Sequence, residues 1–139
     1  MRRFFWIGAL FLGSVGVANA QCNFEKYAQK GIKILSQDYN GFTFLKSYEI
    51  DGAEGKKYSY IFTQGSNYII ALTNNDVNSK GIYISLYDSR NNLVGTSYSN
   101  GKFYSTLEFH CKGTGVYQLK IAFEGVSEHC GVAVLGMRR

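Results

Sequence analysis

Two pairs of adjacent histidine and cysteine residues have the side-chain types that could perform covalent chemistry. His110 precedes Cys111, and His129 precedes Cys130. A histidine beside a cysteine can generate a thiolate nucleophile. Neighbouring side chains in a strand point to opposite faces, however, so neither histidine is well placed to deprotonate the cysteine next to it. Zinc needs three or four ligands, and the sequence has no C-x-x-C pair. We therefore expect structural cysteines and a protein that is not an enzyme.

The carboxylates do not form a catalytic pattern either. Asp88 stands in "LYDSRNNLVGTS", residues 86–97, between two alternating apolar stretches. An aspartate that opens a turn accepts hydrogen bonds from backbone amides just ahead of it, and asparagine tolerates positive φ. Asp88 is therefore predicted to be a turn residue. No Ser-His-Asp or paired-carboxylate arrangement can be assembled with it, which disfavours a hydrolase.

No cofactor is expected, and calcium is the candidate alternative because three acidic residues lie in predicted loops. Asp51, Glu54 and Asp76 offer the hard oxygen ligands that calcium takes. The tract around Asp76, "NNDVN", has no second carboxylate, and the spacing matches no EF-hand loop. The alternative is that these residues belong to solvated loops.

Four tyrosines are the candidate ligand-binding residues: Tyr83, Tyr87, Tyr98 and Tyr104. In residues 82–87 isoleucines and a leucine alternate with the first two tyrosines, so both tyrosines are predicted to point outward. Tyr104 has the opposite parity to Phe103 and Leu107, and Tyr98 falls in the adjoining predicted loop. Tyrosines on one sheet face can stack on sugar rings and donate hydrogen bonds. The alternative is ordinary strand-forming tyrosine, or a face covered by the N-terminal helix.

A helix is predicted over residues 23–38, within an N-terminal segment 21–40. Asn23 is a suitable N-cap. Apolar residues recur at three- and four-residue steps, whereas Lys26, Lys30 and Lys33 fall between them. Packing of this helix on a sheet is favoured over an interfacial membrane helix.

From Phe42 onward the period changes to two, which predicts strands. The predicted strands are 42–50, 58–63, 67–74, 82–88, 93–97, 102–111, 116–124 and 130–137. About eight short strands separated by turn signals are typical of a sandwich. The fold class is therefore predicted as mainly β, a jelly-roll-like antiparallel β-sandwich over residues 41–139 with one N-terminal α-helix.

Residues 1–20 are predicted to be a signal peptide cleaved after Ala20. Arg2 and Arg3 precede an apolar run of about 14 residues, and Ala18-Asn19-Ala20 has small residues where the peptidase requires them. The run is short for a membrane span, and a lipid anchor on Cys22 is a second alternative. The mature chain would be secreted or periplasmic, with a net charge of +3. This mild charge, with no basic cluster, predicts neither a nucleic-acid partner nor stable membrane insertion.

An oxidising compartment favours a disulfide among Cys22, Cys111 and Cys130. In a simple meander Cys111 and Cys130 would lie at opposite ends of the sheet, too far apart to bond. If the first and last strands pair antiparallel, Cys130 lies near Ile50, and a helix running back along the first strand brings Cys22 there. This arrangement predicts a Cys22–Cys130 disulfide, with Cys111 a buried thiol on the side of Leu107.

Three stretches resemble the bacterial pre-peptidase C-terminal domain: "FTQGSNYIIAL", "ISLYDSRNNLVGTS" and "LEFHCKGTGVYQLKI". The resemblance covers roughly residues 45–135. It implies a small β-sandwich of the kind appended to secreted enzymes, some relatives of which bind polysaccharide, collagen or calcium. The chain departs from that family in having a helix rather than an enzyme before the domain, and Asn91-Asn92 where a glycine is usual. The mature chain as a whole also resembles small secreted bacterial proteins.

The predicted function is a secreted, non-catalytic binding or adhesion module for extracellular polysaccharide or protein, acting through the tyrosines. The alternative is a structural or interaction subunit of a cell-envelope assembly, in which Lys26, Lys30 and Lys33 contact an acidic partner.

Overall fold

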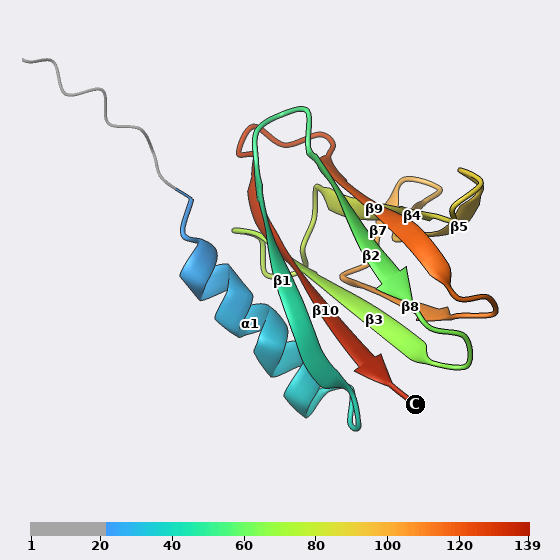
Figure 1. The fold of residues 1–139 in the computed structure, drawn as a ribbon. Helices are drawn as coiled ribbons and strands as arrows, with labels where there is room; N and C mark the ends of the chain where they lie inside the picture. The colour runs from blue at the N-terminus through green and yellow to red at the C-terminus, as the bar shows by residue number, and fades with distance from the viewer. Residues whose placement is uncertain (1–21) are drawn as a thin grey trace, which may run out of the picture.

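The computed structural model describes residues 22–139; the predicted signal peptide, residues 1–20, lies outside this range. Within it the chain forms the helix α1 (Phe24–Gln37), followed by strands. The strands are β1 (Thr43–Asp51), β2 (Lys56–Phe62), β3 (Asn67–Thr73), β4 (Ile82–Tyr87), β5 (Leu93–Thr96), β6 (Tyr98–Ser99), β7 (Lys102–Phe103), β8 (Thr106–His110), β9 (Gly115–Phe123) and β10 (Cys130–Arg138). The helix lies along one side of the strands (Figure 1).

Eight of these strands form two four-stranded antiparallel sheets. Their orders are β1-β10-β3-β8 and β2-β9-β4-β5, and β6 and β7 form a separate two-stranded ribbon. The first and last strands pair with each other, and most connections cross from one sheet to the other. This order is that of a jelly roll. The predicted mainly-β sandwich with one N-terminal helix is therefore confirmed.

The main core fills the space between the two sheets, as the alternation in the sequence predicts. Ile82, Ile84 and Leu86 of β4 are fully buried, whereas the alternating Tyr83, Ser85 and Tyr87 are only partly buried. At one end of the core Phe62 stacks on Tyr68, with ring centroids 4.0 Å apart. The inner face of each sheet is thus occupied by packing, which leaves the outer faces for other contacts.

Helix α1 covers the outer face of the sheet β1-β10-β3-β8 (Figure 1). It begins after Asn23, whose side-chain oxygen accepts a hydrogen bond from the Lys26 amide at 3.4 Å. Tyr27, Gly31 and Leu35 lie one turn apart and form the buried face of the helix. Within the described range, no helix has the length and hydrophobicity needed to cross a bilayer.

One predicted element is wrong: residues 102–111 do not form a single strand. The chain leaves β7 after Phe103 and enters β8 at Thr106. Tyr98 lies in β6 rather than in a loop, because Asn100 and Gly101 adopt positive φ and close a two-residue hairpin between β6 and β7. An Asn-Gly pair is a strong hairpin signal. Because the strand is interrupted, Phe103 and Leu107 belong to different strands. Their alternation with Tyr104 therefore does not assign Tyr104 to a sheet face.

Candidate ligand-binding face

The outer face of the sheet β2-β9-β4-β5 lies on the opposite side of the sandwich from α1 (Figure 1). We call this surface the open face and define it by the outward residues that alternate with buried ones. These residues are Lys57, Ser59, Ile61, Tyr83, Ser85, Tyr87, Leu93, Thr96, Val116, Gln118, Lys120 and Ala122. Two of the four tyrosines that were predicted to bind a ligand, Tyr83 and Tyr87, therefore lie on the same sheet face. Outward residues of β2, β5 and β9 lie on that face too.

Cross-strand pairing arranges the open face in rows. Lys57 lies opposite Lys120, which in turn lies opposite Ser85. In the next row Gln118 lies between Ser59 and Tyr87. Rows along a strand are two residues apart, about 7 Å. A basic row therefore adjoins a row in which an aromatic ring is flanked by an amide.

The open face ends in an apolar hollow beside the Gln118 row. Ile61 is 63% exposed and Val116 is 45% exposed, although both are large apolar residues. Together with Ser59 and Tyr60 they line a hollow of about 490 Å³. Exposed apolar side chains grouped in this way are typical of contact surfaces.

At the other end of β4, Tyr83 belongs to an aromatic cluster. Its ring lies 5.4 Å from that of Tyr98, which lies 4.5 Å from that of Phe103. The β6-β7 ribbon thus brings two further aromatic residues onto the edge of the open face. Burial, and then the nearby Glu124 carboxylate, raise the pKa of Tyr83, so its phenol remains a neutral hydrogen-bond donor.

Tyr104, the fourth predicted tyrosine, lies apart from this cluster. It is 50% exposed, and its ring lies 5.3 Å from the ammonium nitrogen of Lys102. Its amide donates to the carbonyl of Ser97 at 2.8 Å, which positions the backbone rather than the ring. The structure therefore groups Tyr83 with Tyr98, places Tyr87 on β4 with Tyr83, and leaves Tyr104 just after the end of β7.

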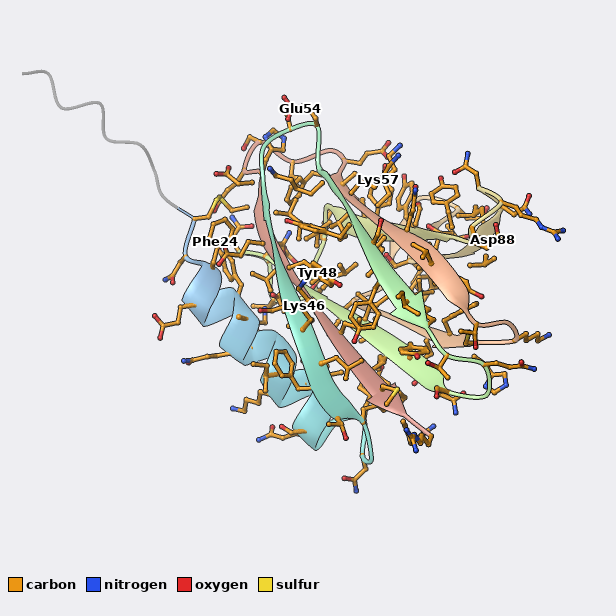
Figure 2. The ribbon with its side chains drawn as sticks, viewed as in Figure 1. Phe24, Lys46, Tyr48, Glu54, Lys57 and Asp88 are labelled. Carbon is orange, nitrogen blue, oxygen red and sulfur yellow. A yellow bond between two sulfur atoms is a disulfide. The ribbon has the colours of Figure 1, made fainter. Side chains whose placement is uncertain are left out.

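The predicted calcium ligands are not brought together. Asp51 lies within 4.8 Å of the sulfurs of Cys22 and Cys130, the one such cluster within residues 22–139, but both sulfurs are in a disulfide. Glu54, the second predicted ligand, is exposed in the loop between β1 and β2 (Figure 2).

Asp76, the third predicted ligand, closes a turn in the β3–β4 loop. Its Oδ1 accepts hydrogen bonds from the amides of Asn78 at 2.9 Å and Lys80 at 3.2 Å. These bonds lower the pKa of Asp76. This carboxylate thus has a local structural role, and the described loops do not gather Asp51, Glu54 and Asp76 around one point.

Asp88 has the predicted turn role. Its Oδ1 accepts from the amides of Arg90 at 3.0 Å and Asn92 at 2.9 Å, and Asn91 adopts a φ of 63°. The bond from the Asn92 amide is the main cause of the lowered pKa of Asp88.

Two of the three cysteines form the predicted disulfide, and the third is the predicted buried thiol. Cys22 and Cys130 form a disulfide with a Cα–Cα distance of 5.4 Å, and the strand pairing places Cys130 opposite Asp51. Cys111 is fully buried, and its thiol donates to the Gly113 carbonyl at 3.2 Å. A disulfide is compatible with an oxidising compartment.

Neither histidine faces the cysteine that follows it in sequence. His110 is exposed, and its Nδ1 lies 2.8 Å from Oδ1 of Asn67. The ring of His129 packs 5.5 Å from that of Phe123. Each imidazole therefore contacts a residue other than the adjacent cysteine.

Sequence reasoning missed several open-face residues, namely Lys57, Ser59, Ile61, Val116, Gln118 and Lys120. The signal for them was present in residues 56–62 and 115–123, where inward residues such as Phe62, Tyr117 and Leu119 alternate with the missed positions. Alternation identifies which residues point outward. Only the register shows that they adjoin Tyr87.

No family model matches the chain, and no curated protein matches it. Among solved structures, a chain of the "Glycosylation Associate Protein (Gap123) complex from Streptococcus agalactiae" is similar over 72% of this chain, with 16% identity and a TM-score of 0.39. The present chain spans 40% of that chain's length. A similarity at this level assigns no function, and the resemblance to the pre-peptidase C-terminal domain stays a prediction.

Proposed function

We propose that this chain is a secreted, non-catalytic binding module that holds an extracellular polysaccharide on the open face. The observation that carries the proposal is one row of the open face. In this row Gln118 lies between Tyr87 and Ser59, and α1 does not cover this sheet face. An aromatic ring beside amide and hydroxyl groups is the combination that recognises sugars, since the ring stacks on C–H groups and the polar groups bond to hydroxyls.

The shape of the open face supports a polymeric ligand. Four strands lie side by side, so the surface is broad and presents Tyr83 and Tyr87 four residues apart along β4, about 13 Å. A single small molecule would not contact both rings, whereas successive sugars of an extended chain would. Flat aromatic platforms need little ordering on binding, since a tyrosine side chain has few rotatable bonds.

The test is retention of the purified mature protein on insoluble polysaccharides. We expect retention of the wild type and its loss in Tyr87→Ala and in Tyr83→Ala with Tyr98→Ala. Phe44→Ala is the matched control, because Phe44 is an exposed aromatic residue on β1 of the other sheet. Retention that survives the tyrosine substitutions but is lost in the control would contradict the proposal.

An assembly role through the helix lysines is the second candidate. Lys26 and Lys33 are exposed on α1, whereas the Lys30 ammonium donates to the Asp76 carbonyl at 3.3 Å. Two exposed cations on the uncovered side of the helix offer a contact for an acidic envelope protein. Recovery of one defined partner that is lost in Lys26→Gln with Lys33→Gln, without retention on any polysaccharide, would favour this role over the first.

A further inference from the structure

Two lysines lie directly opposite each other in the open face. Lys57 of β2 and Lys120 of β9 are cross-strand partners, and both are exposed. Figure 2 labels Lys57 on the sandwich side remote from α1. Directly opposite residues have Cβ atoms about 5 Å apart, and like charges at such positions destabilise a sheet. The free protein therefore holds two cations at a position where they repel each other.

The outward positions of the neighbouring strands contain no compensating anion, and Glu124, whose carboxylate lies near Tyr83, follows the end of β9 four residues beyond Lys120. Of the described residues, every other outward position of β2, β9 and β4 is uncharged. Lys120 lies opposite Ser85, which in turn lies opposite Thr96, so the pair continues into a row of hydroxyl groups. The Thr96 hydroxyl bonds to the backbone of Tyr98, so the row provides two cations and the Ser85 hydroxyl, which are groups that bind an oxyanion.

We infer that the polysaccharide bound by the open face is a polyuronate, whose carboxylates are held between Lys57 and Lys120. The inference rests on the proposed function and specifies its ligand. The basic row adjoins the Tyr87 row, about 7 Å away. A uronic acid carries its carboxylate directly on the sugar ring. A sugar stacked on Tyr87 therefore places its own carboxylate, or that of the next sugar in the polymer, near the two lysines.

A carboxylate fits this site better than a more densely charged group. The open face has two cations in one row, and the rows on either side carry Tyr87, Tyr83, Gln118 and apolar groups. One or two singly charged groups neutralise the pair. A heavily sulfated polymer or an anionic membrane would place further anions over neutral rows and gain nothing there.

The test compares three soluble polymers, polygalacturonate, dextran and dextran sulfate, and phosphatidylglycerol vesicles by titration calorimetry. We expect polygalacturonate to bind most tightly and its affinity to fall as salt rises. In Lys57→Gln with Lys120→Gln the affinity should fall at least tenfold and become nearly independent of salt. The matched control is Lys46→Gln with Arg139→Gln, which removes the same charge from exposed positions on β1 and after β10 of the other sheet and should bind like the wild type.

The outcomes separate this inference from the proposed function. Binding of dextran as tight as that of polygalacturonate, unaffected by the open-face lysine substitutions but lost in Tyr87→Ala, would overturn the inference and leave the proposed function standing. Tighter binding of dextran sulfate, or equal binding to phosphatidylglycerol vesicles, would also overturn it. Binding of none of the polymers, with no retention on insoluble polysaccharides, would overturn both.

Discussion

Cys22 is bonded to Cys130, so the residue that precedes helix α1 is tied to the first residue of the last strand, 108 positions later. The same strand pairing sets Cys130 opposite Asp51 at the end of β1. The disulfide therefore fastens the start of the helix to the central part of the sheet that the helix covers. Its removal should loosen the packing of α1 and should also give the unfolded chain more freedom.

Replacing both bonded cysteines, in Cys22→Ser with Cys130→Ser, should lower the free energy of unfolding by about 3–4 kcal/mol. Closing a long loop in the unfolded chain is the main source of this stabilisation. Urea denaturation followed by circular dichroism measures it. Reductant should destabilise the wild type by a similar amount and leave the double variant unchanged; an equal response of the two proteins would contradict the assignment.

Gly31→Ala should destabilise the protein by about 1–3 kcal/mol, although alanine favours helices. A Cβ at position 31 would lie 2.5 Å from Cγ2 of Val134, so the helix would have to move off β10. Gly113→Ala is the control, because a Cβ there meets nothing within 4 Å. Thermal unfolding of both variants checks the prediction. A stabilised Gly31→Ala variant would contradict it and would show that α1 and β10 can accommodate the added methyl group.

Tyr48→Phe should stabilise the protein by about 1 kcal/mol. Tyr48 lies beside Lys46 on β1 (Figure 2); it is 3% exposed, and its buried hydroxyl has no hydrogen-bond partner among residues 22–139. Removing an unsatisfied buried hydroxyl relieves its desolvation cost. Tyr68→Phe is the counterpart and should destabilise, because the Tyr68 hydroxyl accepts from the Thr63 amide at 2.8 Å. Urea titration distinguishes the two signs.

Stability should fall in alkaline solution between pH 10 and about 12, and less steeply in Tyr48→Phe. Burial, then Tyr60 and Tyr58, raise the pKa of Tyr48 to about 12 from its ordinary value near 10. The folded state therefore keeps the proton more tightly than the unfolded state. That contribution is fully present below pH 10 and is lost as pH rises toward 12. Equal slopes in urea midpoints measured across this range would contradict the pKa shift.

Lys57→Gln alone should raise the melting temperature of the ligand-free protein at low salt, because it removes the repulsion with Lys120. The gain should shrink at high salt as the charges are screened. Lys33→Gln, on the exposed side of α1, serves as the control and should change little. A lower melting temperature for Lys57→Gln would mean that its ammonium has a stabilising partner.

Local sequence patterns determined much of the fold. Asn23 marked the start of the helix, and two-residue alternation identified the strands that became β4 and β9. These patterns can be recognised because a helix or strand that buries one face repeats its apolar residues at a characteristic spacing. The disulfide followed from supposing that the first and last strands pair, which the structure confirms. The Asn100-Gly101 pair also indicates a hairpin, which the strand predicted over residues 102–111 did not take into account.

The candidate site was decided by the tertiary structure. Lys57 and Lys120 are 63 positions apart, and nothing near either residue indicates the other. The contact between Tyr83 and Tyr98 likewise depends on a ribbon folding back over the neighbouring sheet. Alternation shows which side of a strand a residue occupies, but the register between strands arises from packing of the whole core. The sequence alone therefore determined which side chains face solvent, and only the folded chain decided which of them lie together.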